Sequence, residues 1–258
     1  MVKRIKKENK KEVNNKSKVV NIFRIIFIIL IIISILGIAI WIINGIKNKK
    51  LNDKISRFVT TKEIESNEKI ENEYVVDFDE INKVNEDAIA WIKVPGTQIG
   101  YLVVKGKNND YYLNHNLEKK YNQAGWIFAD YKNKFDGTDK NIVLYGHNRE
   151  DGTMFGSMKD ILKEDWYNNE ENHEIDFIIE NGEKQKYHVF SVYQTKTEDY
   201  YIDTEFKDGE FHKFVTVLKN RSKKDFGIDV SEEDCILTLS TCANNYRDRI
   251  VLHAKKIK

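Results

Sequence analysis

Two apolar runs near the C-terminus decide the fold of this chain. Residues 235–242 read CILTLSTC, and residues 247–253 read RDRIVLH. Both runs alternate between apolar and polar residues, which is typical of β-strands that bury one face. The first run ends in a cysteine, and the second opens with arginine. We therefore expect two neighbouring strands that bring a thiol and a guanidinium group to one end of a sheet.

Short strand-like segments recur upstream of this pair. Alternating or apolar stretches lie at 88–94, 98–104, 125–129, 141–146, 173–180 and 187–194. A helical period appears only later, at 208–221, where Phe211, Phe214, Val215 and Leu218 share one face. A short helix is also expected at 78–88, and the polar stretch 44–77 predicts a helical stalk. Many short strands with few helices favour a mainly β fold, closed or nearly closed.

One long segment is free of charged residues. Residues 25–43 read IIFIILIIISILGIAIWII, and a helix of that length spans about 28 Å, close to the hydrocarbon thickness of a bilayer. Residues 1–24 carry nine basic and two acidic residues, a net charge of +7. The positive-inside rule then predicts a basic cytoplasmic tail, one transmembrane helix, and everything after residue 44 outside the cell. A cleaved signal peptide is the alternative, but its apolar core would usually be shorter, and no small-x-small site follows.

The charge of the remaining chain bears on its partners. Since the whole chain carries +1 and the tail +7, the rest carries −6. A weakly acidic domain argues against nucleic acid as a partner. The basic tail is better explained as a topology signal that contacts anionic lipids.

The two cysteines differ in their expected roles. In one extended strand, Cys235 and Cys242 are separated by seven steps of about 3.3 Å, too far for a disulfide, and they point to opposite faces. Cys242 is therefore expected to be an unpaired thiol and Cys235 a core residue. Because an exposed thiol outside the cell is prone to oxidation, its presence suggests chemistry. No Cys/His spacing suits zinc, and no cofactor is implied.

Among the six histidines, His147 has the most suggestive position. It ends the strongly apolar stretch 141–148, NIVLYGHN, and Gly146 lets the backbone turn before it. A thiolate can attack an acyl carbon while an imidazolium protonates the leaving amine. A surface histidine at a strand end remains the alternative. His188 and His253 lie inside alternating strands and are expected to be half-exposed.

Strand parity singles out one arginine. Arg249 shares a face with Val251, while Ile250 and Leu252 lie on the other. If Ile250 and Leu252 fill the core, Arg249 meets the cleft, where a guanidinium can hold a carbonyl or stabilise an oxyanion. Arg247 has the same parity but lies farther into the turn. A solvated surface arginine is the alternative reading.

Three separated motifs together resemble the signature of the sortase family. They are TLSTC at 238–242, YGH at 145–147, and Arg249 at the head of the final strand. The resemblance runs from about residue 84 to the C-terminus and includes 85–92, NEDAIAWI, which is similar to the segment that leads into the sortase barrel. The helix expected at 208–221 is similar to the one that class B sortases carry before the catalytic strand.

The resemblance implies a fold and an activity. The fold would be a mainly β, eight-stranded sortase barrel with N-terminal helices and the inserted helix, covering a catalytic domain at 78–258. Such enzymes are membrane-anchored cysteine transpeptidases of Gram-positive envelopes. They cleave a C-terminal sorting motif of a secreted protein after Thr, hold it as a thioester, and transfer it to an amine of a peptidoglycan cross-bridge or lipid-linked precursor. Carried over by position, Cys242 is the nucleophile, His147 the general acid and base, and Arg249 the clamp for substrate and oxyanion.

The resemblance also suggests residues that bind the motif, for which ordinary packing is the alternative. They are Asn109, Leu113, Tyr145, Tyr201, Ile202, Ser240 and Thr241. The chain departs from some relatives in the short span between Cys242 and Arg249, which leaves Arg247 as an alternative clamp.

Rival functions remain compatible with the same residues. An envelope cysteine peptidase would use the same thiol and imidazole but transfer the acyl group to water. A sortase of another class, housekeeping or pilin-polymerising, is disfavoured by the inserted helix. A non-catalytic membrane-tethered binding module would need no thiol chemistry at all.

Overall fold

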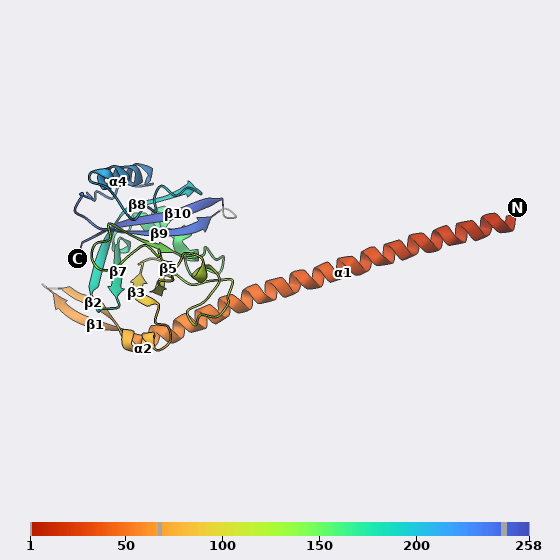
Figure 1. Ribbon diagram of the computed structural model, residues 1–258, viewed down its shortest axis with the longest axis horizontal. Coiled ribbons are helices and arrows are strands. Elements are labelled where there is room, and N and C mark those ends of the chain that lie inside the picture. The colour runs from red at the N-terminus through yellow and green to blue at the C-terminus, as the bar shows by residue number, and fades with distance from the viewer. Residues whose placement is uncertain (1, 67–68, 244–246, 258) are drawn as a thin grey trace. The chain divides into compact units, whose positions relative to one another are not determined.

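The computed structural model divides the chain into two compact units. It describes residues 2–66, 69–243 and 247–257, but not the side chains of 2–18, 64–66, 69–72, 242 and 243. The units are Met1–Asn44 and Gly45–Lys258. The described part of the first unit is helical and belongs to α1 (Val2–Ile55) (Figure 1). The stretch Val19–Phe58 in the described chain is long and apolar enough to cross a membrane. It is therefore a candidate anchor.

The second unit is built on a closed β-barrel (Figure 1). Among the described residues, eight strands close in the order β10-β8-β7-β3-β4-β5-β6-β9. Their bounds are β3 (Ala88–Lys93), β4 (Gly100–Val104), β5 (Phe128–Ala129), β6 (Asn141–Tyr145), β7 (Glu174–Ile179), β8 (Lys184–Lys196), β9 (Ile236–Ala243) and β10 (Asp248–Lys256). The pairs β4–β5 and β6–β9 are parallel, and the others are antiparallel. The expected mainly β barrel is confirmed.

Helical segments in the second unit are short and lie between strands. The α-helices after α1 are α2 (Phe78–Asn82), α3 (Glu164–Tyr167) and α4 (Glu210–Arg221), and the 3-10 helices are η1 (Ser56–Phe58), η2 (Tyr111–Leu113), η3 (Gly156–Leu162) and η4 (Glu170–Asn172). Asp77 caps α2, because its carboxylate accepts a hydrogen bond from the Glu80 amide at 3.1 Å. The inserted helix before the C-terminal strand pair is confirmed as α4.

The segment between the apolar helix and the barrel differs from the expected helical stalk over 44–77. Helix α1 ends at Ile55, and the antiparallel hairpin of β1 (Val59–Ser66) and β2 (Lys69–Val76) follows. The strand ends hold β-branched and aromatic residues, with Val59 opposite Val76 and Thr61 opposite Tyr74, and such pairs favour sheet over helix. The Tyr74 ring lies 4.7 Å from the Trp91 ring of β3. The helical prediction holds for residues 44–55, which belong to α1, and was wrong for β1 and β2, where cross-strand pairing outweighed a weak helical pattern.

Alternation along the last two strands separates two cores. Leu239 of β9 and Ile250 and Leu252 of β10 pack in the barrel interior. Val251 lies in a second core, beneath α4. Phe211, Val215 and Leu218 form the buried face of α4. The predicted parity of β10 is therefore confirmed, and Arg249 shares the side of the sheet that faces away from the barrel interior.

His253 lies within this second core and is fully buried, not half-exposed as expected. Its Nδ1 lies 2.9 Å from the Thr238 hydroxyl and its Nε2 lies 3.0 Å from the Tyr193 hydroxyl. The Thr238 hydroxyl donates to Asn141 at 2.7 Å, so Nδ1 carries the proton and Nε2 accepts. The sequence pattern failed here because helix α4 covers the outer face of the sheet.

We expect His253 to make the fold sensitive to acid. Burial lowers the pKa of His253 to about 3, below the value of about 6.5 in an unfolded chain. The unfolded chain therefore binds the extra proton between these values, so the stabilisation is complete above about pH 6.5 and is lost as the pH falls. Urea unfolding of the full chain in detergent micelles should show a loss of about 2 kcal/mol from about pH 7 to about pH 5.

The control for this experiment is His212→Gln, on the exposed side of α4. It should keep the acid sensitivity of the parent chain, whereas His253→Phe should reduce it and leave the contribution of His173, whose pKa is also lowered by burial. An unchanged slope in His253→Phe would contradict the assignment.

Candidate active site

The register of three strands brings the predicted catalytic positions to one end of the barrel. In the parallel pair β6–β9, Tyr145 is the partner of Ser240, and His147 and Cys242 each lie two residues farther along. In the antiparallel pair β9–β10, Cys242 is the direct partner of Arg249. The side chain of Cys242 lies outside the described residues, so its position rests on backbone register alone.

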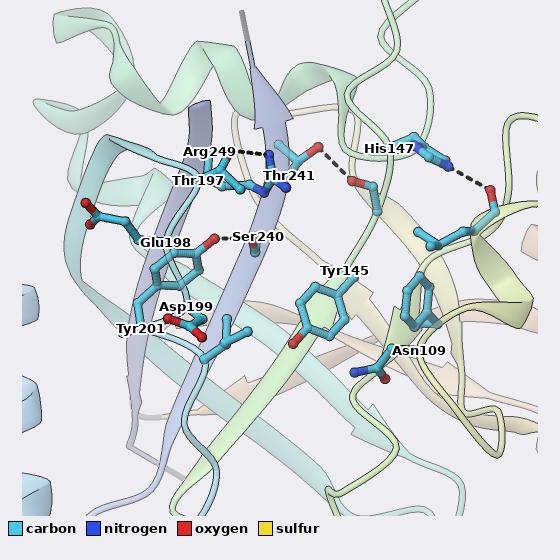
Figure 2. A pocket seen from close by; sticks show the side chains of 14 residues that line it. Asn109, Tyr145, His147, Thr197, Glu198, Asp199, Tyr201, Ser240, Thr241 and Arg249 are labelled. Carbon is cyan, nitrogen blue, oxygen red and sulfur yellow. Dashed lines mark hydrogen bonds between the residues drawn. The ribbon is translucent and has the colours of Figure 1, made fainter. Parts of the chain in front are cut away.

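A pocket of about 570 Å³ opens at this end of the barrel (Figure 2). Apart from Cys242, every residue that the sequence assigned to catalysis or to motif binding lines this pocket. The lining residues are Asn109, Leu113, Phe128, Tyr145, Gly146, His147, Thr197, Glu198, Asp199, Tyr201, Ile202, Ser240, Thr241 and Arg249. The volume is typical of pockets that bind a small molecule or a few residues of peptide.

His147 is held by a backbone carbonyl. Its Nε2 lies 2.7 Å from the carbonyl oxygen of Leu113, at the end of η2 (Figure 2). A carbonyl can only accept, so Nε2 carries a proton in this contact. Nδ1 is then the nitrogen that can gain or lose a proton.

Gly146 is required by close packing. A Cβ at this position would lie 2.8 Å from Cγ of the buried Phe155 ring, and its φ is not among the positive values. The Gly146 carbonyl accepts a hydrogen bond from the Thr241 hydroxyl at 2.6 Å. This contact ties the end of β6 to the end of β9, one residue before each proposed catalytic position.

Arg249 extends along the pocket wall formed by the loop after β8. Its Nη1 donates to the Thr197 hydroxyl at 3.2 Å and to the Asp248 carbonyl at 3.1 Å. Arg247 is exposed, and its carbonyl accepts from the Thr197 amide at 3.1 Å. Of the two arginines, Arg249 lines the pocket.

One wall of the pocket is organised by a carboxylate that the sequence did not single out. Asp130 is 4% exposed, and its Oδ2 accepts from Tyr145 at 2.8 Å and from Asn109 at 2.9 Å. Burial, and next to it the charge of Asp130, raises the pKa of Tyr145. The phenol therefore stays protonated and acts as a hydrogen-bond donor.

The opposite wall is held by Tyr201. Its hydroxyl lies 3.0 Å from the Ser240 hydroxyl (Figure 2), and the Asn141 amide bonds the Tyr201 carbonyl at 3.5 Å and the Asp203 carbonyl at 2.9 Å. Ile202 follows in the same loop and lines the pocket. These contacts fix the loop against the ends of β6 and β9.

Several lining residues were missed from the sequence. Thr197, Glu198 and Asp199 precede Tyr201 in the same loop, so their proximity to a proposed site residue was the available signal. Phe128 comes from the two-residue strand β5, and its pattern did not distinguish it from a core residue.

Cys235 is poorly suited to nucleophilic chemistry. It is partly buried against the barrel core, and its Sγ lies 4.0 Å from the Tyr187 hydroxyl. Burial raises the pKa of its thiol to about 11, so little thiolate forms near neutral pH. Among the described residues, no group of three His, Cys, Asp or Glu side chains could hold a metal ion.

Comparison with known proteins identifies the family. The sortase domain model matches residues 92–257. Sortase B of Staphylococcus aureus is 38% identical over 70% of this chain and 75% of its own length, and sortase B of Listeria monocytogenes is 35% identical over 69% and 73%. The crystal structure of sortase B from B. anthracis in complex with AAEK1 matches with a TM-score of 0.72 and 32% identity, over 84% of this chain and 99% of that one. The chain therefore belongs to the sortase family of cysteine transpeptidases and, within it, to class B.

Proposed function

We propose that this class B sortase cleaves a C-terminal sorting motif of secreted proteins after Thr and transfers the protein to a peptidoglycan amine. The observation that carries the proposal is the strand register, which sets His147, Cys242 and Arg249 at one end of β6, β9 and β10. The pocket beside them has one wall organised by Asp130 and another held by Tyr201. A peptide bound in this pocket would lie beside His147, Cys242 and Arg249.

The proposed first step forms the thioester. The proton of the Cys242 thiol passes to Nδ1 of His147, the thiolate attacks the carbonyl carbon of the motif Thr, and Arg249 stabilises the oxyanion. The C–N bond then breaks, and the imidazolium of His147 gives its Nδ1 proton to the leaving amine. The bond between Nε2 and the Leu113 carbonyl keeps the ring oriented while this proton moves.

The proposed second step restores the thiol. An amine of a peptidoglycan cross-bridge or of its lipid-linked precursor attacks the thioester carbon, and His147 takes up the proton that the amine loses. The new amide bond forms as the C–S bond breaks, and His147 returns its proton to the Cys242 thiolate, so the thiol is regenerated. No cofactor takes part in either step.

In this proposal the chain is a single-pass protein of the cell membrane. Residues 1–24 lie in the cytoplasm, 25–43 cross the bilayer, and the catalytic domain at 78–258 works outside the cell. The apolar, exposed helix supports the anchor, and the basic tail supports the orientation.

The test is intact-mass spectrometry of the chain with a panel of sorting-motif peptides, with and without a primary amine. One peptide should leave an acyl adduct on Cys242, and the amine should enter the product. The Cys235→Ala variant should keep the adduct, and Cys242→Ala should lose it. No adduct with any peptide would contradict the mechanism, and an adduct that only water resolves would indicate a peptidase.

A further inference from the structure

One side of the last turns of α1 is buried in the second unit, Gly45–Lys258. Gly45 and the residues after it belong to the unit Gly45–Lys258. Leu51 and Ile55 pack in the barrel core cluster, and Asn48 is 0% exposed. We call residues 45–55 the α1 end. A buried amide must find hydrogen-bond partners, and the partners of Asn48 show what this segment holds.

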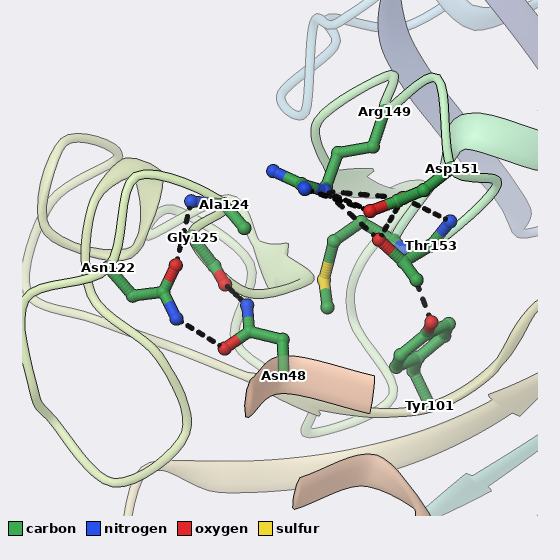
Figure 3. A network of polar contacts seen from close by, with 9 residues as sticks. Asn48, Tyr101, Asn122, Ala124, Gly125, Arg149, Asp151 and Thr153 are labelled. Atoms are coloured by element: carbon green, nitrogen blue, oxygen red, sulfur yellow. Dashed lines mark hydrogen bonds and ion pairs between the residues drawn. The ribbon is translucent and has the colours of Figure 1, made fainter. Parts of the chain in front are cut away.

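Both polar atoms of the Asn48 side-chain amide form hydrogen bonds (Figure 3). Its Nδ2 donates to the Gly125 carbonyl at 2.8 Å, and its Oδ1 accepts from Asn122 at 2.7 Å. Asn122 also accepts from the Ala124 amide at 2.9 Å. Asn48 therefore holds the turn at 122–125 from inside the unit.

That turn supports the carbonyl that binds His147. A Cβ on Gly125 would lie 2.5 Å from the Tyr112 carbonyl oxygen and 2.8 Å from that of Leu113. The Trp126 amide donates to the Tyr112 carbonyl at 2.9 Å. Tyr112 precedes Leu113, whose carbonyl binds His147 Nε2 at 2.7 Å. The turn at 122–125 is therefore linked to the proposed catalytic base through the Trp126–Tyr112 hydrogen bond and the close approach of Gly125 to both carbonyls.

The α1 end also touches the loop that follows His147. A Cβ on Gly45 would lie 2.6 Å from Nη2 of Arg149 and from Oδ2 of Asp151. Arg149 pairs with Asp151 at 2.8 Å (Figure 3), and the Phe155 amide closes the loop on the His147 carbonyl at 3.0 Å. Two separate sets of contacts thus lead from the α1 end to His147.

We propose that Asn48 is a positioning residue for His147, acting through the backbone of Gly125 and the carbonyl of Leu113. By this inference one side chain of the α1 end supports the active site without being part of it. The inference rests on the proposed role of His147 in catalysis. Asn48 itself touches no substrate.

The test uses the full chain in detergent micelles. Asn48→Leu removes both hydrogen bonds and keeps a similar side-chain volume. Asn52→Leu is the matched control, because Asn52 lies one turn later on the same helix and bonds the Gly100 carbonyl at 3.0 Å, at the start of β4. The readouts are kcat and KM with a sorting-motif peptide, the melting temperature, and the His147 tautomer from ¹⁵N spectra of labelled imidazole.

We expect Asn48→Leu to lower kcat by about tenfold or more with little change in KM, because a misplaced base is felt mainly in the chemical step. The spectrum should change from one Nε2–H tautomer to a mixture. Asn52→Leu should keep the kcat and the tautomer, even if it melts earlier. Asn48→Asp, which can still accept from Asn122 but cannot donate to Gly125, should behave like Asn48→Leu.

An unchanged kcat and tautomer in both Asn48 variants would overturn the proposal, as would equal losses in Asn52→Leu. Failure of both Asn48 variants to fold, with Asn52→Leu folded, would also overturn it, because Asn48 would then serve the fold and not His147. If the parent chain turns over no peptide, the proposed function fails, and the tautomer spectra alone decide whether Asn48 positions the ring.

Discussion

Replacing Cys242 by alanine should abolish turnover of sorting-motif peptides, with a loss of at least about 10⁴-fold in kcat/KM. The reason is chemical, since alanine offers no nucleophile and the thioester cannot form. The other thiol cannot substitute, because Cys235 is partly buried and its pKa is raised to about 11. The measurement is product formation by the full chain under saturating amine.

The control for this loss is Cys235→Ala, which should keep turnover. Near-ultraviolet circular dichroism should show that Cys242→Ala retains its tertiary packing. A Cys242→Ala chain that keeps its ligand binding and its cellular role would favour a membrane-tethered binding module over an enzyme.

Replacing Arg249 by methionine should lower kcat/KM by about 10²- to 10³-fold, the usual effect of losing one oxyanion donor. The guanidinium donates to Thr197 at 3.2 Å and lines the pocket. Arg249→Lys should recover only part of the rate, because an ammonium group cannot bind the Thr197 hydroxyl and a substrate oxygen in one fixed plane. Steady-state kinetics with the best peptide of the panel provide the measurement.

Arg247→Met is the matched variant and should keep the rate within about twofold, as surface charges contribute little. Arg247 is exposed, and it is Arg249 that pairs with Cys242 in the ladder. The opposite result, with Arg247→Met inactive and Arg249→Met active, would show that Arg247 and not Arg249 binds the substrate.

Local pattern predicted those elements whose burial follows from their own residues. The alternation of β10 placed Ile250 and Leu252 in the barrel and Arg249 on the other side, and the structure agrees. The same rule failed for His253, since α4 covers the outer face of the sheet and buries both sides of β10 there. Parity assigns a residue to a face but does not say what covers that face.

Other parts of the site depend on contacts between distant segments. Asp130 lies 15 residues from Tyr145 and 21 from Asn109, and no spacing in the sequence joins the three. The hairpin at 59–76 likewise owes its form to pairing across strands, with Val59 opposite Val76. Single-sequence patterns carry little information on such pairs, because the partner is chosen by the fold.

The sequence by itself determined that the chain has an apolar helix, a mainly β domain and a cysteine at a strand end, because these follow from composition, periodicity and chain geometry. Only the tertiary structure decided which residues meet. The parallel register of β6 and β9 sets His147 and Cys242 at the same strand ends, and the antiparallel register of β9 and β10 chooses Arg249. Register is set by packing of whole strands around a shared core, and a shift of one residue would turn each of these side chains to the other face.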